Sequence, residues 1–122
     1  MGKIDFSEYS FVFNASAYFN ALDKYPDGFI EPLLKGGRDS FDAICWFLQE
    51  LSTQGELIRR HYGMDKREVL LEETSRSLLK PKDIVEARNL IIETITKGMN
   101  SDGDEEEVDE VLLELQKKTT SG

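Results

Sequence analysis

The chain opens with apolar positions that alternate with polar ones. Period-two alternation rich in aromatic residues is typical of β-strands, and the Ser7-Glu8 pair stands where a tight turn would join two of them. The alternating apolar residues are Ile4, Phe6, Tyr9, Phe11 and Phe13. The pattern therefore predicts a small N-terminal β-hairpin, which needs helices to pack against because two strands alone are marginal in water.

The spacing then changes to three and four residues, which is typical of amphipathic helices. Asn14 is a favourable N-cap for a helix from Ala15 to Lys24, and Tyr25-Pro26 would end it. The stretch after Asp27 predicts a second, short helix that stops at Gly36-Gly37.

The clearest core helix is predicted from Asp39 to Thr53. Its apolar stripe contains Phe41, Ile44, Leu48 and Leu51, widened by Cys45 and Phe47. Gly55 is expected to interrupt or kink the helix before it continues from Glu56 to Tyr62. Gly63 is expected to stop it in the left-handed conformation.

Two further helices are predicted in the next part of the chain. Asp65 and Glu68 have the spacing of a capping box, which favours a helix that runs to about Leu79. Pro81 suits the first turn of the following helix, expected over Lys82 to Gly98. The inward stripe of that helix contains Ile84, Ala87, Ile91 and Ile95.

After a polar break at residues 100–104, a last amphipathic helix is predicted. Its apolar face consists of Val108, Val111, Leu112 and Leu115. The predicted fold class is therefore α+β and mostly α-helical, with the hairpin packed on a bundle of about five helices. The expected organisation is a helical domain over 1–99 and an acidic linker with a detachable amphipathic helix over 100–122.

The charge is distributed unevenly along the 122 residues. The formal net charge is −9, and residues 101–122 contribute −6 of it, from eight acidic residues against Lys117 and Lys118. Such a balance argues against nucleic acid as the partner, because affinity for phosphates comes mainly from Lys and Arg. The basic spots at 59–61 and 66–67 have acidic neighbours and are typical of a solvated helix face.

The sequence favours a cytoplasmic protein without a membrane partner. No run approaches the roughly 20 apolar residues of a membrane span, and the first residues lack the apolar stretch of a signal peptide. The single cysteine, Cys45, excludes a disulfide within the chain and fits a reducing compartment.

Candidate chemistry is sparse, so we expect no enzyme, no cofactor and no specific metal site. His61 is the only histidine and has no nucleophile motif beside it, and Cys45 lies within an apolar stripe. The acidic stretch "DGDEEEVDE" does not follow the EF-hand pattern, because Glu107 stands where the loop needs glycine. An enzyme using a carboxylate-bound divalent ion is the remaining chemical alternative.

The order of these elements resembles that of the phage tail assembly chaperones of Gram-positive phages and prophages. The resemblance covers most of the chain and is carried by "DFSEYSFVFN", by "QGELIRRHYG" and by "LLKPKDIVEARNLIIETITKGM". Similar sequences often have Thr or Ser before the proline, where this chain has Lys80. None of these motifs is a catalytic signature.

The resemblance implies a non-enzymatic protein of the host cell cytoplasm that is required for tail assembly and absent from the finished tail. It would bind and solubilise the tape measure protein until tail tube protein polymerises around it. A longer, frameshifted form of the chain is a further implied partner, with Lys117-Lys118 as a candidate slippage position, and homo-oligomerisation stays open. The alternative is a structural tail or head–tail joining component that is retained in the virion.

A helical chaperone would cover its partner with apolar helix faces. The residues expected to bind the partner come from three helices, with Trp46 as a rim or anchor residue; the competing interpretation is that the stripes pack on each other inside the domain. They are Phe41, Ile44, Trp46, Leu48, Leu51, Ile84, Ile91, Ile95, Val108, Val111, Leu112 and Leu115.

Overall fold

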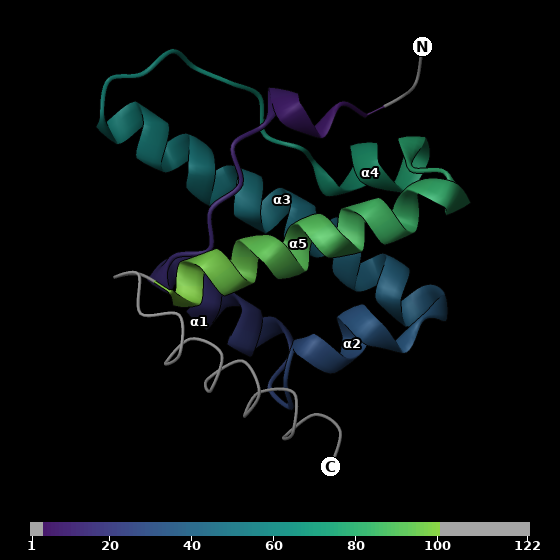
Figure 1. The fold of residues 1–122 in the computed structure, drawn as a ribbon. Helices are drawn as coiled ribbons and strands as arrows, with labels where there is room; N and C mark the ends of the chain where they lie inside the picture. Colours follow the sequence, from purple (N-terminus) through teal and green to yellow (C-terminus); the bar gives the residue numbers. More distant parts are fainter. Residues whose placement is uncertain (1–3, 101–122) are drawn as a thin grey trace.

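The computed structural model describes residues 4–100, and the chain is helical wherever it has regular secondary structure within that range. One long helix, α3, is the element on which the others pack, and α5 crosses it (Figure 1). The elements in order are η1 (Phe6–Glu8), α1 (Ala15–Lys24), α2 (Ile30–Lys35), α3 (Gly37–His61), α4 (Glu72–Leu78), η2 (Pro81–Asp83) and α5 (Ile84–Met99). The predicted bundle of about five helices is confirmed.

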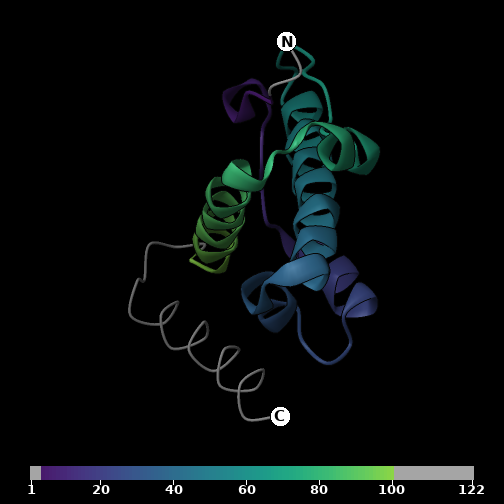
Figure 2. The same cartoon turned by 90° about the vertical axis from the view of Figure 1, so that its right-hand side faces the viewer.

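The predicted N-terminal hairpin is wrong, because residues 4–14 form no strand. Asp5 accepts a hydrogen bond from the Ser7 amide at 3.0 Å, and the Tyr9 amide donates to the Phe6 carbonyl at 3.2 Å. These bonds close a 3₁₀ turn at the position where the alternation suggested a hairpin turn. The rest of the segment runs singly between α3 and α5 (Figure 2). The alternation therefore marks a segment covered by helices and not a pair of strands.

Two helical glycines let the backbone of this N-terminal segment approach closely. A Cβ atom added to Gly55 in α3 would overlap the carbonyl oxygen of Ser10, and one added to Gly98 in α5 would overlap that of Phe13. The Val12 amide also donates to the Leu51 carbonyl at 3.1 Å. The sequence predicts that Gly55 interrupts or kinks the helix, but α3 continues through this residue without interruption. Its role is to leave room for the crossing segment.

The segment that follows α3 is the second departure from expectation. The capping box predicted at Asp65 is absent, and the helix there begins only at Glu72. Side chains of α3 accept the backbone N–H groups instead: Arg67 donates to Glu56 at 3.0 and 3.1 Å, and Leu70 donates to Ser52 at 2.9 Å. The Glu72 amide donates to Gln49 at 2.7 Å. Because these acceptors replace intrahelical partners, residues 65–71 stay non-helical.

The other predicted helix boundaries lie within about two residues of those in the structure, and several of the predicted caps and stops are confirmed. Asn14 caps α1 by accepting a hydrogen bond from the Ala17 amide at 2.9 Å. The break after α2 falls at Gly36 and Gly37, with φ of 88° and 71°, and the stop after α3 at Gly63 has φ of 70°. Only glycine adopts such values without strain. Pro81 stands at the first residue of η2, directly before α5.

The core lies where α1, α2, α3 and α5 meet the N-terminal segment. Phe29 joins these layers, since its ring centroid lies 5.9 Å from that of Phe13 and 5.7 Å from that of Phe47. The fully buried side chains of α3 and α5 surround this aromatic group. α5 ends at Met99, and the predicted acidic linker and helix beyond it lie outside the described residues.

Candidate functional site

Five of the eight predicted partner-binding residues that the structure describes lie in the core. Their helical stripes face inward, and Trp46 lies at the core edge with its ring 6.3 Å from that of Tyr25. Ile44, Leu48, Leu51, Ile91 and Ile95 are fully buried, and Phe41, Trp46 and Ile84 are half-buried. Val108, Val111, Leu112 and Leu115 lie outside the described residues. A partner can therefore reach the half-buried residues in this conformation, but not the buried ones.

A surface groove runs between η1 and the outward face of α5, and we call it the outer groove. Its main hollow has a volume of about 570 Å³, and a second hollow of about 370 Å³ shares Phe6 and Glu86 with it. The lining of the main hollow is Phe6, Lys82, Val85, Glu86, Asn89, Leu90 and Glu93. The second hollow adds Ile4, Asp5, Leu79 and Asp83.

Helix geometry explains the mixed character of the outer groove. Each residue turns an α-helix by about 100°, so Val85 and Leu90 lie on the two edges of the outward face. Glu86, Asn89 and Glu93 lie between these edges. Val85 is 57% exposed, which is high for an apolar side chain in a helix. The groove thus offers apolar edges around a charged floor.

The sequence pattern missed the apolar residues of the outer groove. Phe6 was assigned to the hairpin, whereas Val85 and Leu90 lie off the inward stripe of α5. A signal was nevertheless present at Val85, because it is an apolar residue at a position where the helix faces solvent. Such residues are the ones to examine for contacts with a partner.

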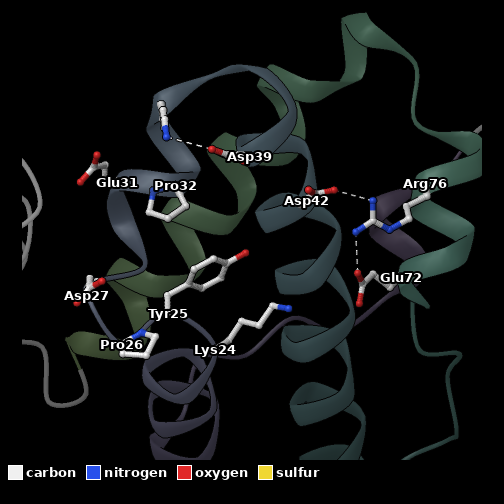
Figure 3. A pocket seen from close by; sticks show the side chains of 12 residues that line it. Lys24, Tyr25, Pro26, Asp27, Glu31, Pro32, Asp39, Asp42, Glu72 and Arg76 are labelled. Atoms are coloured by element: carbon white, nitrogen blue, oxygen red, sulfur yellow. Dashed lines mark hydrogen bonds and ion pairs between the residues drawn. The ribbon is translucent and has the colours of Figure 1, made fainter.

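A separate hollow, an acidic cleft, is shown in Figure 3. It has a volume of about 550 Å³ and lies between the end of α1, α2, the start of α3 and α4. Its charged lining residues are five acids and three bases: Asp27, Glu31, Asp39, Asp42, Glu72, Lys24, Lys35 and Arg76.

Most of the charged side chains in the acidic cleft are engaged in ion pairs. Arg76 bridges Asp42 at 2.7 Å and Glu72 at 3.0 Å, and thereby ties α4 to α3. Lys35 pairs with Asp39 at 3.0 Å. Partial burial, with the nearby carboxylates of Asp42 and Glu72, raises the pKa of Tyr25 above its ordinary value. The cleft is therefore a mildly acidic surface in which ion pairs hold α3 and α4 together.

The two residues most often found in nucleophilic catalysis are far apart. Cys45 is fully buried, and burial raises the pKa of its thiol to about 11, so the thiol stays protonated at neutral pH. His61 is exposed at the end of the same helix, 16 residues on, which corresponds to about 24 Å along the helix axis. These two residues do not form a catalytic pair. Within residues 4–100, no group of three His, Cys, Asp or Glu side chains is placed to hold a metal ion.

Comparisons with protein-family models, with curated proteins and with solved structures found no match to this chain. Among the described helices, none is both long and apolar enough to cross a membrane.

Proposed function

We propose that this protein is a phage tail assembly chaperone that binds helical segments of the tape measure protein and keeps them soluble. The proposal combines the sequence resemblance with one structural observation, the outer groove. A long helical partner exposes apolar stripes that aggregate when left bare. A chaperone for it needs an apolar contact surface outside its own core.

The outer groove provides such a surface in the described part of the chain. Phe6, Val85 and Leu90 present apolar atoms to the groove while the inward stripe of α5 stays engaged in the core. An amphipathic helix laid into a groove is recognised by anchors at three- and four-residue spacing. Lys82, Glu86 and Glu93 would contact polar residues that flank those anchors. In this proposal the partner binds without opening the core.

The electrostatics suit a transient complex. A net charge of −9 keeps many bound copies soluble and mutually repelling. A groove with a charged floor gives modest affinity for each copy, and many copies along one tape measure protein supply avidity. Modest affinity per copy also permits displacement when tail tube protein polymerises.

The experiment is co-expression with the tape measure protein of the same phage or prophage, followed by solubility and co-purification measurements. Val85→Lys places a charge on the groove edge at a position that is already 57% exposed. Leu34→Lys is the matched control, because Leu34 is 51% exposed on α2, away from the groove. We expect Val85→Lys to lower the soluble tape measure protein and Leu34→Lys to leave it unchanged.

Three results would contradict the proposal. The first is a tape measure protein whose solubility does not depend on this chain. The second is an equal effect of both variants, which would show that the outer groove is not the binding surface. The third is stoichiometric amounts of the chain in purified particles by mass spectrometry, which would identify a retained structural component.

A further inference from the structure

Three of the seven large apolar side chains that are exposed among residues 4–100 lie within eight residues of one another, near the end of α3 and in the loop after it. Leu57 is 55% exposed, Tyr62 is 74% exposed and Met64 is 51% exposed. We call them, together with Arg60, Lys66 and Arg67, the α3 terminal patch. Exposed apolar groups gathered in this way usually mark an interaction site.

The local backbone explains why these side chains face solvent. Gly63 has φ of 70° and reverses the chain, and the Met64 amide donates to the Arg59 carbonyl at 2.9 Å. Arg59 holds the far side of the turn by donating to the Asp65 carbonyl at 2.7 Å. The turn is thus fixed by hydrogen bonds, and the apolar side chains are presented from a defined backbone.

The patch is also basic in an otherwise acidic protein. Residues 57–67 contain four basic side chains and one acidic residue, Asp65. The buried Glu56 pairs with Arg60 at 3.0 Å and lies 3.8 Å from Arg59, while Lys66 and Arg67 are exposed. A fitting ligand is therefore acidic and amphipathic.

The chain contains a segment with this chemistry. Residues 104–115 combine the acids of "DEEEVDE" with Val108, Val111, Leu112 and Leu115 at helical spacing. We propose that residues 104–118 dock on the α3 terminal patch of the same molecule, with the apolar stripe on Leu57, Tyr62 and Met64 and the acids beside Lys66 and Arg67.

The distance between the two sites allows docking within one molecule. Gly98 touches Phe13 and Gly55 touches Ser10, so about 10 Å of extended chain separates α5 from α3 at these contacts. The seven residues from Gly55 to Tyr62 add about 10 Å of helix. Residues 101–107 can span about 24 Å when extended. Short tethers of this kind produce effective concentrations in the millimolar range, so weak contacts suffice.

The test places a nitroxide spin label on the full chain at Gln116→Cys. Cys45 is fully buried, so the label attaches to the new thiol. We expect loss of amide NMR signal for Tyr62, Met64 and Lys66, but not for Val85 in the outer groove. The loss should persist on about tenfold dilution, because docking within one molecule does not depend on concentration. It should weaken as salt is added, because the charged pairs are exposed.

A charge reversal with a matched control tests the ionic part. Lys66→Glu should lower the docked-to-free ratio about twofold to fivefold, the range for solvent-exposed ion pairs. Lys80→Glu, at another exposed lysine, should leave the ratio unchanged. Leu112→Ser tests the apolar stripe and should abolish the signal loss at the patch.

Several outcomes would overturn this inference. One is no signal loss at the patch, and another is a loss centred on the outer groove. A third is a loss that appears in an isotope-labelled chain only when it is mixed with a separate spin-labelled chain, because docking would then occur between molecules. The interaction concerns this chain alone, so its failure leaves the proposed chaperone function untouched.

Discussion

Two non-helical segments lie on α3, and they are held in opposite ways. The N-terminal segment approaches because Gly55 and Gly98 have no side chains, so that backbone meets helix directly. The segment at 65–71 is held by side chains, since Ser52 and Glu56 accept its amide hydrogens and Gln49 accepts that of Glu72, the first residue of α4. The N-terminal segment thus lies against α3 where a glycine leaves room for its backbone, and the second segment is held by hydrogen-bond acceptors on α3. The path of a loop can therefore be encoded in the residues of the helix on which the loop lies.

The largest expected effect comes from adding a side chain at Gly55, where the backbone of the N-terminal segment lies against α3. In Gly55→Ala the new methyl group would overlap the Ser10 carbonyl, and overpacking against backbone should lower the free energy of unfolding by about 3 kcal/mol. The control is Gly37→Ala, where the added Cβ meets nothing within 4 Å and only the positive φ is strained. That strain should cost about 1 kcal/mol. Urea unfolding measures both, and equal losses would mean that the close approach is not important.

Glu56 should give the second effect, and it depends on pH. Burial alone would raise the pKa of Glu56, but the Arg67 amide and Arg60 outweigh burial and lower it below the ordinary 4.5. A lowered pKa contributes stability that is fully present above 4.5 and is lost as pH falls through the folded-state pKa. We expect Glu56→Gln to flatten the acid limb of the stability profile. An unchanged acid limb in urea unfolding at several pH values would contradict this role.

Ser52→Ala should have a smaller effect. It leaves the buried Leu70 amide without its acceptor at 2.9 Å, which costs about 1–2 kcal/mol. Thr53→Ala is a neighbouring control, because its hydroxyl donates to the Gln49 carbonyl of its own helix at 2.7 Å and not to the loop. Hydrogen exchange at Leu70 should speed up in the Ser52 variant alone. If both variants behaved alike, the serine would not anchor the loop.

The smallest effect is expected where the two segments meet. Arg67 donates to the Ser7 carbonyl at 3.4 Å, a long and exposed hydrogen bond. Arg67→Ala should change the free energy of unfolding by less than about 0.5 kcal/mol, as is usual for surface substitutions. The backbone amide of Arg67, which bonds to Glu56, is retained in this variant. A large loss of stability would show that the segments are coupled and not held independently by α3.

The sequence predicted what local rules control. Asn14 with α1, the glycine stops and Pro81 before α5 follow from capping and backbone preferences within a few residues. The two errors depended on distant residues. Nothing near Phe6 reveals that Gly55 and Gly98 will cover both sides of its segment, and nothing near Asp65 reveals that Glu56 will accept the Arg67 amide.

The same distinction between local rules and distant contacts applies to the candidate site. The inward stripes of α3 and α5 were predicted from helical spacing, and they form the core. The outer groove depends on where η1 comes to lie against α5, which is a tertiary contact between residues about 80 apart. Val85 could be noticed in the sequence as an exposed apolar position, but the opposite side of the groove, Phe6, could not.

The pair of glycines at 55 and 98 has an evolutionary consequence. Most surface positions of a helical protein accept many different side chains, because surface substitutions usually change stability little. The two crossing points allow no such freedom, since any larger residue would displace backbone. In diverged descendants of this fold, small residues in the long helix and near the end of the last helix should outlast the rest of the sequence. Small residues at these two positions would then help to recognise distant relatives of this fold.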